Sequence, residues 1–100
     1  MPTFVNIIAT TAATSGGAAT ANTAPSGVWI LNHPSNAADC VLRIGNAAIT
    51  ASISTQGWAL KNNTETYIAP YFLLDSNGTP NINQLWIYAT TTGQTACVRY

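Results

Sequence analysis

Short apolar stretches recur along the chain, and clusters of Gly, Pro, Asn, Asp and Ser separate them. The stretch Cys40–Ile44 alternates in period two, whereas Val28–Leu31 and Leu85–Ala89 are apolar throughout. Stretches of this length between turn residues are typical of β-strands. The β-type stretches are Phe4–Ala9, Val28–Leu31, Cys40–Ile44, Ala48–Ser54, Thr66–Ala69, Tyr71–Leu74, Leu85–Ala89 and Thr95–Tyr100.

This rhythm predicts an all-β fold. About eight short strands at close spacing, with no convincing amphipathic helix, favour a β-sandwich or a barrel, and a jelly roll is the best single interpretation. The length of 100 residues fits a single domain over residues 1–100. Within that domain, residues 10–26 (TTAATSGGAATANTAPS) contain no large apolar side chain, so we expect a flexible arm or a long loop.

The composition is unusual in its low content of charged residues, which bears on how the surface is used. Only 6% of the residues are charged and the formal net charge is zero, whereas roughly a quarter of the residues of an ordinary soluble protein are charged. Permanent subunit interfaces are depleted in charge, so we expect neighbouring subunits to cover much of the surface. The alternative is a monomer that hydroxyl and amide groups keep in solution. The charged residues are Asp39, Arg43, Lys61, Glu65, Asp75 and Arg99.

The scarcity of cations argues against two classes of partner. Binding to nucleic acid or to an anionic membrane surface requires clustered Lys and Arg, and this chain has three such residues, spread along its length. No apolar stretch approaches the ~20 residues that span a bilayer, and residues 1–8 lack the cationic region of a secretion signal. We expect neither partner, and we expect the protein to stay where it is made or to leave within a particle.

Catalysis finds little support in the sequence. The carboxylates Asp39, Glu65 and Asp75 each lie in or beside an expected turn, and His33 is the only histidine. No nucleophile-elbow motif and no glycine-rich phosphate-binding motif occurs. We therefore expect no enzyme activity and no cofactor.

The two cysteines, Cys40 and Cys97, do not form a disulfide framework. Together with His33 they also lack the paired local spacing of zinc ligands, so we expect no metal site. In a reducing cytosol they would be free thiols. The alternation of the flanking residues directs Cys40 toward the core and Cys97 toward the opposite face.

The three tryptophans raise the possibility of a sugar-binding module, because aromatic faces stack on sugars. Trp29 and Trp86 lie inside the two most apolar stretches, where we expect core or subunit-interface positions. Trp58 follows Gly57 in an expected loop and is the best exposed candidate, with Tyr67 and Tyr71 as further stacking residues. An ice-binding surface would need a regular array of threonines, and the threonines here show no fixed repeat.

Three segments, with the turns between them, carry a family-like pattern: Val28-Trp29-Ile30-Leu31-Asn32, Leu42-Arg43-Ile44-Gly45, and Leu85-Trp86-Ile87-Tyr88-Ala89 followed by a Thr-Gly turn and Thr95-Ala96-Cys97-Val98-Arg99-Tyr100. In this pattern the chain from Gly27 to Tyr100 resembles small β-sandwich proteins encoded among the structural proteins of tailed bacteriophages. The resemblance rests on strands and turns and includes no catalytic signature.

The resemblance implies a virion protein that is assembled in the bacterial cytoplasm and located on the capsid surface. A head decoration or cement protein of this kind commonly forms trimers over gaps between capsid subunits, so the expected partners are other copies of the chain and the major capsid protein. The alternative is a carbohydrate- or receptor-binding module of a phage tail or spike. Residues expected at subunit or capsid interfaces are Phe4, Val5, Ile7, Ile8, Trp58, Tyr71 and Tyr100.

Overall fold

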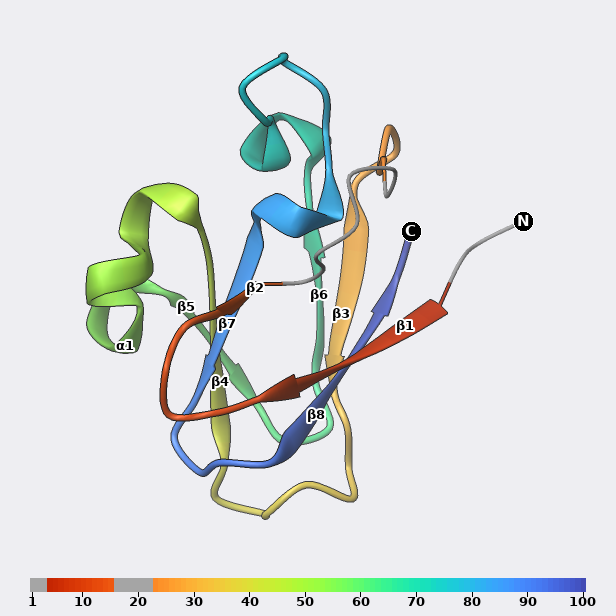
Figure 1. Ribbon diagram of the computed structural model, residues 1–100. Coiled ribbons are helices and arrows are strands. Elements are labelled where there is room, and N and C mark those ends of the chain that lie inside the picture. Colours follow the sequence, from red (N-terminus) through yellow and green to blue (C-terminus); the bar gives the residue numbers. More distant parts are fainter. Residues whose placement is uncertain (1–3, 16–22) are drawn as a thin grey trace.

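Two four-stranded antiparallel sheets pack face to face in the computed structural model, which describes residues 4–15 and 23–100 (Figure 1). The strands are β1 (Phe4–Ala9), β2 (Thr14–Ser15), β3 (Val28–Asn32), β4 (Val41–Asn46), β5 (Trp58–Lys61), β6 (Glu65–Ile68), β7 (Leu85–Ala89) and β8 (Gln94–Arg99). The helical segments are η1 (Ala47–Ser52), α1 (Ile53–Gln56), η2 (Pro70–Leu73) and η3 (Ile82–Gln84). The predicted all-β sandwich is confirmed.

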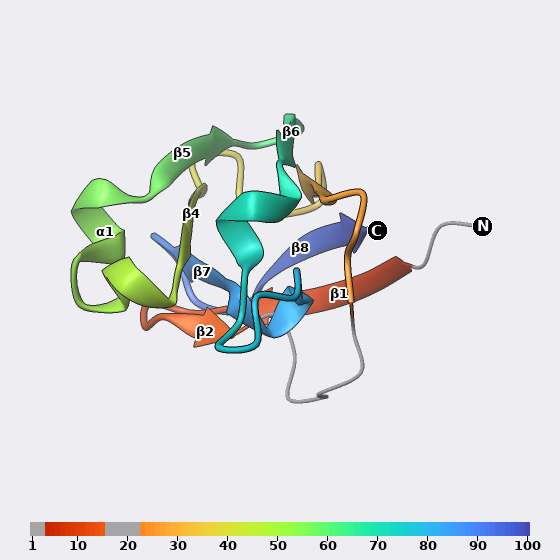
Figure 2. The same ribbon diagram turned by 90° about the horizontal axis from the view of Figure 1, so that it is seen from above.

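The strand order is that of a jelly roll. Sheet A has the order β1-β8-β3-β6 and sheet B the order β2-β7-β4-β5. The first strand pairs with the eighth, the second with the seventh, the third with the sixth and the fourth with the fifth, all antiparallel. One long antiparallel hairpin that is rolled into two sheets gives this order. Viewed from above, the sheets form two layers (Figure 2).

The core lies between the sheets and follows from the alternation within each strand. In β3 the side chains of Val28 and Ile30 are buried while Trp29 is exposed, and in β7 Ile87 is buried while Trp86 is half-buried. Trp29 and Trp86 therefore lie on the outer faces of their sheets, and a core position for either is wrong. The buried apolar residues of the strands come from all strands but β2 and are Ile7, Ala9, Val28, Ile30, Leu42, Ile44, Leu60, Ile68, Leu85, Ile87, Ala89, Ala96 and Val98.

The stretch 48–54, predicted as a weak strand, is helical and forms η1 and the start of α1. Its apolar residues Ile49 and Ile53 are four apart, a spacing that fits one face of a helix as well as one face of a strand. The Asn46 side chain accepts a hydrogen bond from the Ala48 amide and caps the segment. Gly45 has no Cβ, so Ile49 and Ile53 can pack over its Cα.

The stretch 71–74 also differs from the predicted strand. Residues 71–73 lie in η2, and Pro70 occupies its first turn, where the fixed φ of proline favours a helical start. Leu73 of this turn is buried and closes one end of the core.

Both ends of the predicted arm, residues 10–26, belong to the sandwich. Thr14 and Ser15 form β2 at the edge of sheet B, paired with β7. At the other end, Thr23 bridges to Asn81, and the buried Ala24 donates its amide to the Pro80 carbonyl at 2.9 Å. Small side chains do not prevent this, because backbone hydrogen bonds attach the segment. Residues 16–22 of the predicted arm lie outside the described residues.

A buried asparagine ties the two sheets together at one end. Asn32, at the end of β3, is fully buried, and its Nδ2 donates to the Leu60 carbonyl of sheet B at 2.9 Å and to the Cys40 carbonyl at 3.2 Å. Its Oδ1 accepts from Asn36 Nδ2 at 2.7 Å, and Asn36 also bonds the backbone of Thr95 through both its amide atoms. Three strands and the loop before β4 therefore share one amide network.

Replacing Asn32 by Leu should destabilise the fold by about 3 kcal/mol, because two buried carbonyls would lose their donor. Urea unfolding at fixed protein concentration measures this free energy. The matched control is Asn77→Ala in the exposed turn, which should change stability by less than about 0.5 kcal/mol. Equal stabilities of the two variants would show that the network does not hold the sheets together.

Gly27 and Gly78 allow a second test, because both have positive φ (82° and 75°) but differ in the space around Cα. A Cβ on Gly27 would lie 2.4 Å from the Ile68 carbonyl oxygen, whereas nothing lies within 4 Å of one on Gly78. Gly78→Ala should cost about 1–2 kcal/mol from backbone strain alone. Gly27→Ala should cost at least about 1 kcal/mol more, because β3 and β6 must separate. Thermal unfolding of both variants measures the difference, and equal costs would contradict this steric account.

Candidate functional site

The outer face of sheet A is rich in exposed apolar side chains. Since β1, β8, β3 and β6 are paired in register, Phe4, Arg99, Trp29 and Tyr67 lie in one row across the four strands. Phe4 is 72% exposed, and Trp29 and Tyr67 are also exposed. We call this surface the sheet A face; its residues are Phe4, Asn6, Ile8, Trp29, Leu31, Glu65, Tyr67, Thr95, Cys97 and Arg99.

The two charges of this face neutralise each other. Arg99 Nη2 lies 3.2 Å from Glu65 Oε1, and the Arg99 guanidinium stands 5.1 Å from the centre of the Trp29 ring. Trp29 in turn packs against Tyr67, with ring centres 5.1 Å apart. The Tyr67 hydroxyl donates to the Ser26 carbonyl at 2.7 Å, which fixes the ring. The face is therefore largely apolar and electrically neutral, and contacts within it restrain its Trp29, Tyr67 and Arg99 side chains.

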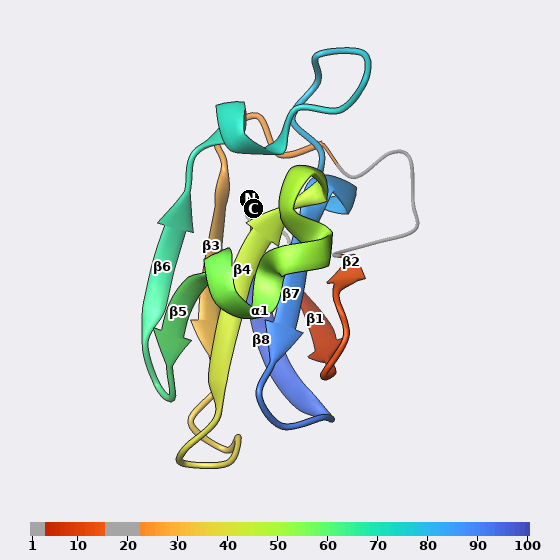
Figure 3. The same ribbon diagram turned by 90° about the vertical axis from the view of Figure 1, so that its left-hand side faces the viewer.

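The outer face of sheet B, in contrast, is covered by the chain itself. η1 and α1 lie in front of β4 and β7 (Figure 3). Ile53 is buried under this cover, and the Cβ of Arg43 lies beside Gly57. Of the described elements, none lies on the sheet A face in the same way. A large exposed apolar patch of this kind marks a site of interaction with another molecule.

Cys97 lies near the middle of the sheet A face, between Asn6 and Leu31 on the neighbouring strands. It is half-buried, and burial raises the pKa of its thiol. Cys40 is buried in the core, and neither cysteine forms a disulfide. The predicted orientations of the two cysteines are confirmed.

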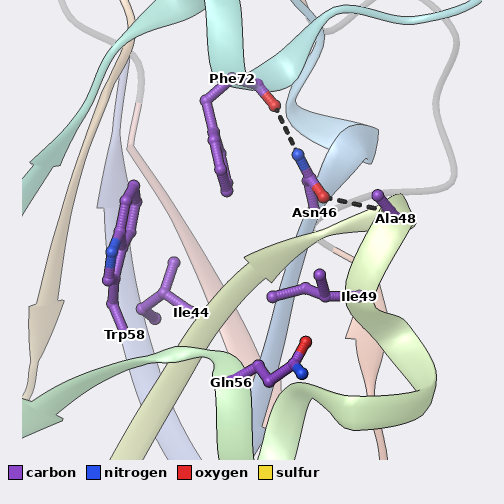
Figure 4. Close-up of a pocket in the computed structure, with 7 residues that line it drawn as sticks. All are labelled: Ile44, Asn46, Ala48, Ile49, Gln56, Trp58 and Phe72. Carbon is purple, nitrogen blue, oxygen red and sulfur yellow. Dashed lines mark hydrogen bonds between the residues drawn. The ribbon is translucent and has the colours of Figure 1, made fainter.

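A separate pocket opens at the edge of the sandwich where β4, β5 and η2 meet (Figure 4). Its volume is about 300 Å³, within the range of small-molecule sites. The indole of Trp58, which is 51% exposed, stacks on Phe72 with ring centres 4.8 Å apart. The lining residues are Ile44, Asn46, Ala48, Ile49, Gln56, Trp58 and Phe72.

Two amides supply the polar groups of the pocket. Asn46 Nδ2 donates to the Phe72 carbonyl at 3.2 Å while its Oδ1 accepts from the Ala48 amide, so the side chain is held in place. Gln56 Oε1 accepts from the Ser52 hydroxyl at 2.9 Å, which leaves Nε2 without a partner among the described residues. The pocket thus combines an aromatic wall with fixed neutral hydrogen-bonding groups.

The predicted interface residues separate into different environments. Phe4 and Ile8 are exposed on the sheet A face, whereas Ile7 faces inward and is buried in the core. Ile7 is therefore a core residue, because period two places it opposite its two neighbours. Val5 and Tyr100 are half-buried and pack against the core.

The remaining two predicted residues, Trp58 and Tyr71, lie outside the sheet A face. The expectation that Trp58 lies in a loop is wrong, because it begins β5 and pairs with Ile44. Trp58 lines the pocket, and Tyr71, the most exposed aromatic residue at 78%, is adjacent in sequence to Phe72 but is not part of the lining. The sugar-stacking candidates are separated too, because Tyr67 belongs to the sheet A face.

Sequence reasoning missed Leu31 on the sheet A face and Asn46, Gln56 and Phe72 in the pocket. Val28–Leu31 is apolar throughout, so no polar residue reveals which side chains face outward. The pocket residues come from three segments that only the fold brings together. For Asn46, the Asn before a run of Ala was an available capping signal.

The described residues contain no cluster suited to acid–base or metal chemistry. His33 Nδ1 is 2.6 Å from the Ser35 hydroxyl and accepts from the Ser35 amide, and Asp75 accepts from the amides of Asn77 and Thr79, so both order local turns. No group of three or more His, Cys, Asp and Glu side chains within residues 4–15 and 23–100 could hold a metal ion. Within the same residues, no helix has the length and apolar character needed to cross a membrane.

Comparisons with known protein families, curated proteins and solved structures gave no match to this chain.

Proposed function

We propose that this protein is a structural subunit of a bacteriophage virion, a capsid decoration or cement protein that binds to other copies of itself and to the major capsid protein. The observation that carries the proposal is the sheet A face, an apolar and neutral surface that no described element covers. Phe4, Ile8, Trp29 and Tyr67 expose large apolar groups there. Such a surface gains stability when a partner removes it from water.

The architecture supports the same class of function. Jelly rolls are frequent in viral capsid proteins and also in lectins. The low charge content favours the capsid alternative, because the interior of a protein interface is depleted in charge. The resemblance of residues 27–100 to small phage structural proteins points in the same direction.

The proposed subunit acts by bridging. In a trimer, each copy would use its sheet A face against a neighbouring copy, and the trimer would then contact several capsid subunits at once. Weak individual contacts become a stable attachment when several must break together. The task requires no reaction, only area, shape and a fixed orientation of the contacting surfaces.

Light scattering on the purified chain should show a trimer. The double variant Phe4→Ser, Ile8→Ser should raise the dissociation constant of the oligomer at least about tenfold, because two large apolar side chains would no longer be removed from water by the partner. Tyr71→Ser is the matched control, since it removes an equally exposed aromatic ring outside the sheet A face. A wild-type monomer at high concentration, or equal effects of the two changes, would contradict the proposal.

Cys97 provides an independent measure of the covered face. Its raised thiol pKa lowers the thiolate fraction at neutral pH, so alkylation by iodoacetamide should be slower than for an unperturbed cysteine and should accelerate as the pH rises. In the wild-type oligomer, the partner subunit should cover Cys97 and slow its alkylation further. The Phe4→Ser, Ile8→Ser variant should lose this additional protection. Mass spectrometry of Cys97 and Cys40 at several pH values measures this. Equal Cys97 rates in oligomer and variant would show that the sheet A face is not the interface.

Electron microscopy of the particle that contains the protein tests the assignment to the virion. We expect the chain on the outer surface of the capsid, in copies related by the capsid symmetry. Particles that lack the protein should lose their shell at a lower temperature or in weaker denaturant. A location in the tail, or capsids of unchanged stability without it, would refute the cement role.

A further inference from the structure

The pocket between β4, β5 and η2 has a chemistry that the role of a capsid cement does not need. Its lining comes from β4 and β5 of sheet B and from η1, α1 and η2 (Figure 4), whereas the sheet A face belongs to the other sheet. Of the described residues that line it, none carries an ionisable side chain. A charged ligand would lose its hydration there without gaining a counter-ion, so the natural ligand is neutral.

The wall of the pocket is a rigid aromatic surface. Trp58 stacks on Phe72 at an interplanar angle of 26°, and both rings line the cavity beside Ile44. Trp58 remains half-exposed, so part of the indole is open to a ligand. An aromatic ring that neighbouring groups already hold in place loses little conformational entropy when a ligand binds.

The hydrogen-bonding groups are amides whose orientation is also fixed. Asn46 is held by two hydrogen bonds, and the Ser52 hydroxyl holds the oxygen of Gln56. The Gln56 Nε2 group remains as a donor. An amide can both donate to and accept from hydroxyl groups. A wholly apolar ligand would leave the Gln56 Nε2 donor without a partner, at a cost in binding free energy.

We propose that this pocket binds one ring of a neutral carbohydrate. A pyranose ring has a C–H face that packs against an aromatic surface and hydroxyl groups around its rim that bond to amides. Trp58 would contact the C–H face, and Gln56 and Asn46 would bond the hydroxyls. Because the pocket is small and open, the dissociation constant for a single sugar is of the order of millimolar.

The test is titration of the ¹⁵N-labelled full chain, followed by NMR, with methyl glycosides of glucose, galactose, mannose and N-acetylglucosamine. At least one glycoside should shift the Trp58 indole N–H and the Gln56 side-chain amide signals in a saturable manner. Cyclohexanol, a ring of similar size with most hydroxyls removed, should bind at least about tenfold more weakly. If no glycoside shifts these signals at 50-fold excess over about 1 mM, or if cyclohexanol binds as well, the proposal is overturned.

Variants separate the pocket from the rest of the surface. Trp58→Ala should weaken binding at least about tenfold, and Gln56→Leu, which keeps the size of the side chain but removes the amide, about fivefold. Tyr71→Ala is the control, since it removes a neighbouring exposed ring that does not line the pocket, and should leave binding unchanged. Because Trp58→Ala can perturb Phe72, the Gln56→Leu result decides if the alanine variant unfolds. An unchanged affinity of Gln56→Leu, or an equal loss in Tyr71→Ala, would overturn the assignment of the ligand to this pocket.

The outcome is independent of the oligomer experiments. Sugar binding can fail while the sheet A face still forms the trimer, and the trimer can be absent while the pocket still binds. The two sets of variants share only the Tyr71 control.

Discussion

The side-chain amide of Asn32 links the two sheets by directional hydrogen bonds, which apolar contacts cannot supply. Apolar side chains hold the sheets together without specifying how one sheet is placed on the other, because the hydrophobic effect has no direction. The hydrogen bonds from Asn32 Nδ2 to the carbonyls of Leu60 and Cys40 do have a direction, and they lie where water cannot replace them. They determine how β3 of sheet A is placed relative to β5 and the start of β4. The pocket depends on this placement, since Trp58 belongs to β5 of sheet B, whereas Phe72 lies in η2, directly after β6 of sheet A.

The two sheets differ in how far their outer faces are exposed, and this difference bears most directly on function. Sheet B is covered by η1 and α1, and Gly45 makes that cover possible because its Cα has no side chain in the way of Ile49 and Ile53. Sheet A presents its aromatic residues to solvent. Helical segments cover one sheet, whereas aromatic side chains on the other sheet remain exposed. This exposed surface is suited to contact with a partner. The pocket shares no residue with the sheet A face, so one small domain would be able to bind a neighbour and a ligand at the same time.

The sequence was informative about strands and much less so about faces and loops. Turn residues and short apolar runs were enough to predict β1, β3, β4, β7 and β8 and the sandwich itself. Residues 48–54 were misassigned because isoleucines four apart satisfy the periods of helix and strand alike. The outward position of Trp29 was hidden because β3 has apolar residues on both sides. The pocket could not be predicted from the sequence, since Asn46, Gln56 and Phe72 become neighbours only after sheet B and η2 have packed together.

The order of the strands in the sheets also limits when each strand can pair during synthesis of the chain. Within sheet A, β8 lies between β1 and β3, so β1 has no backbone partner in that sheet until residues 94–99 have been synthesised. During translation the segment Phe4–Ala9, apolar and free of charge, must therefore wait with its backbone unpaired, and the fold closes late through contacts that are distant in sequence. The chain would face its greatest risk of aggregation in this interval, before the last strand enters the sheet.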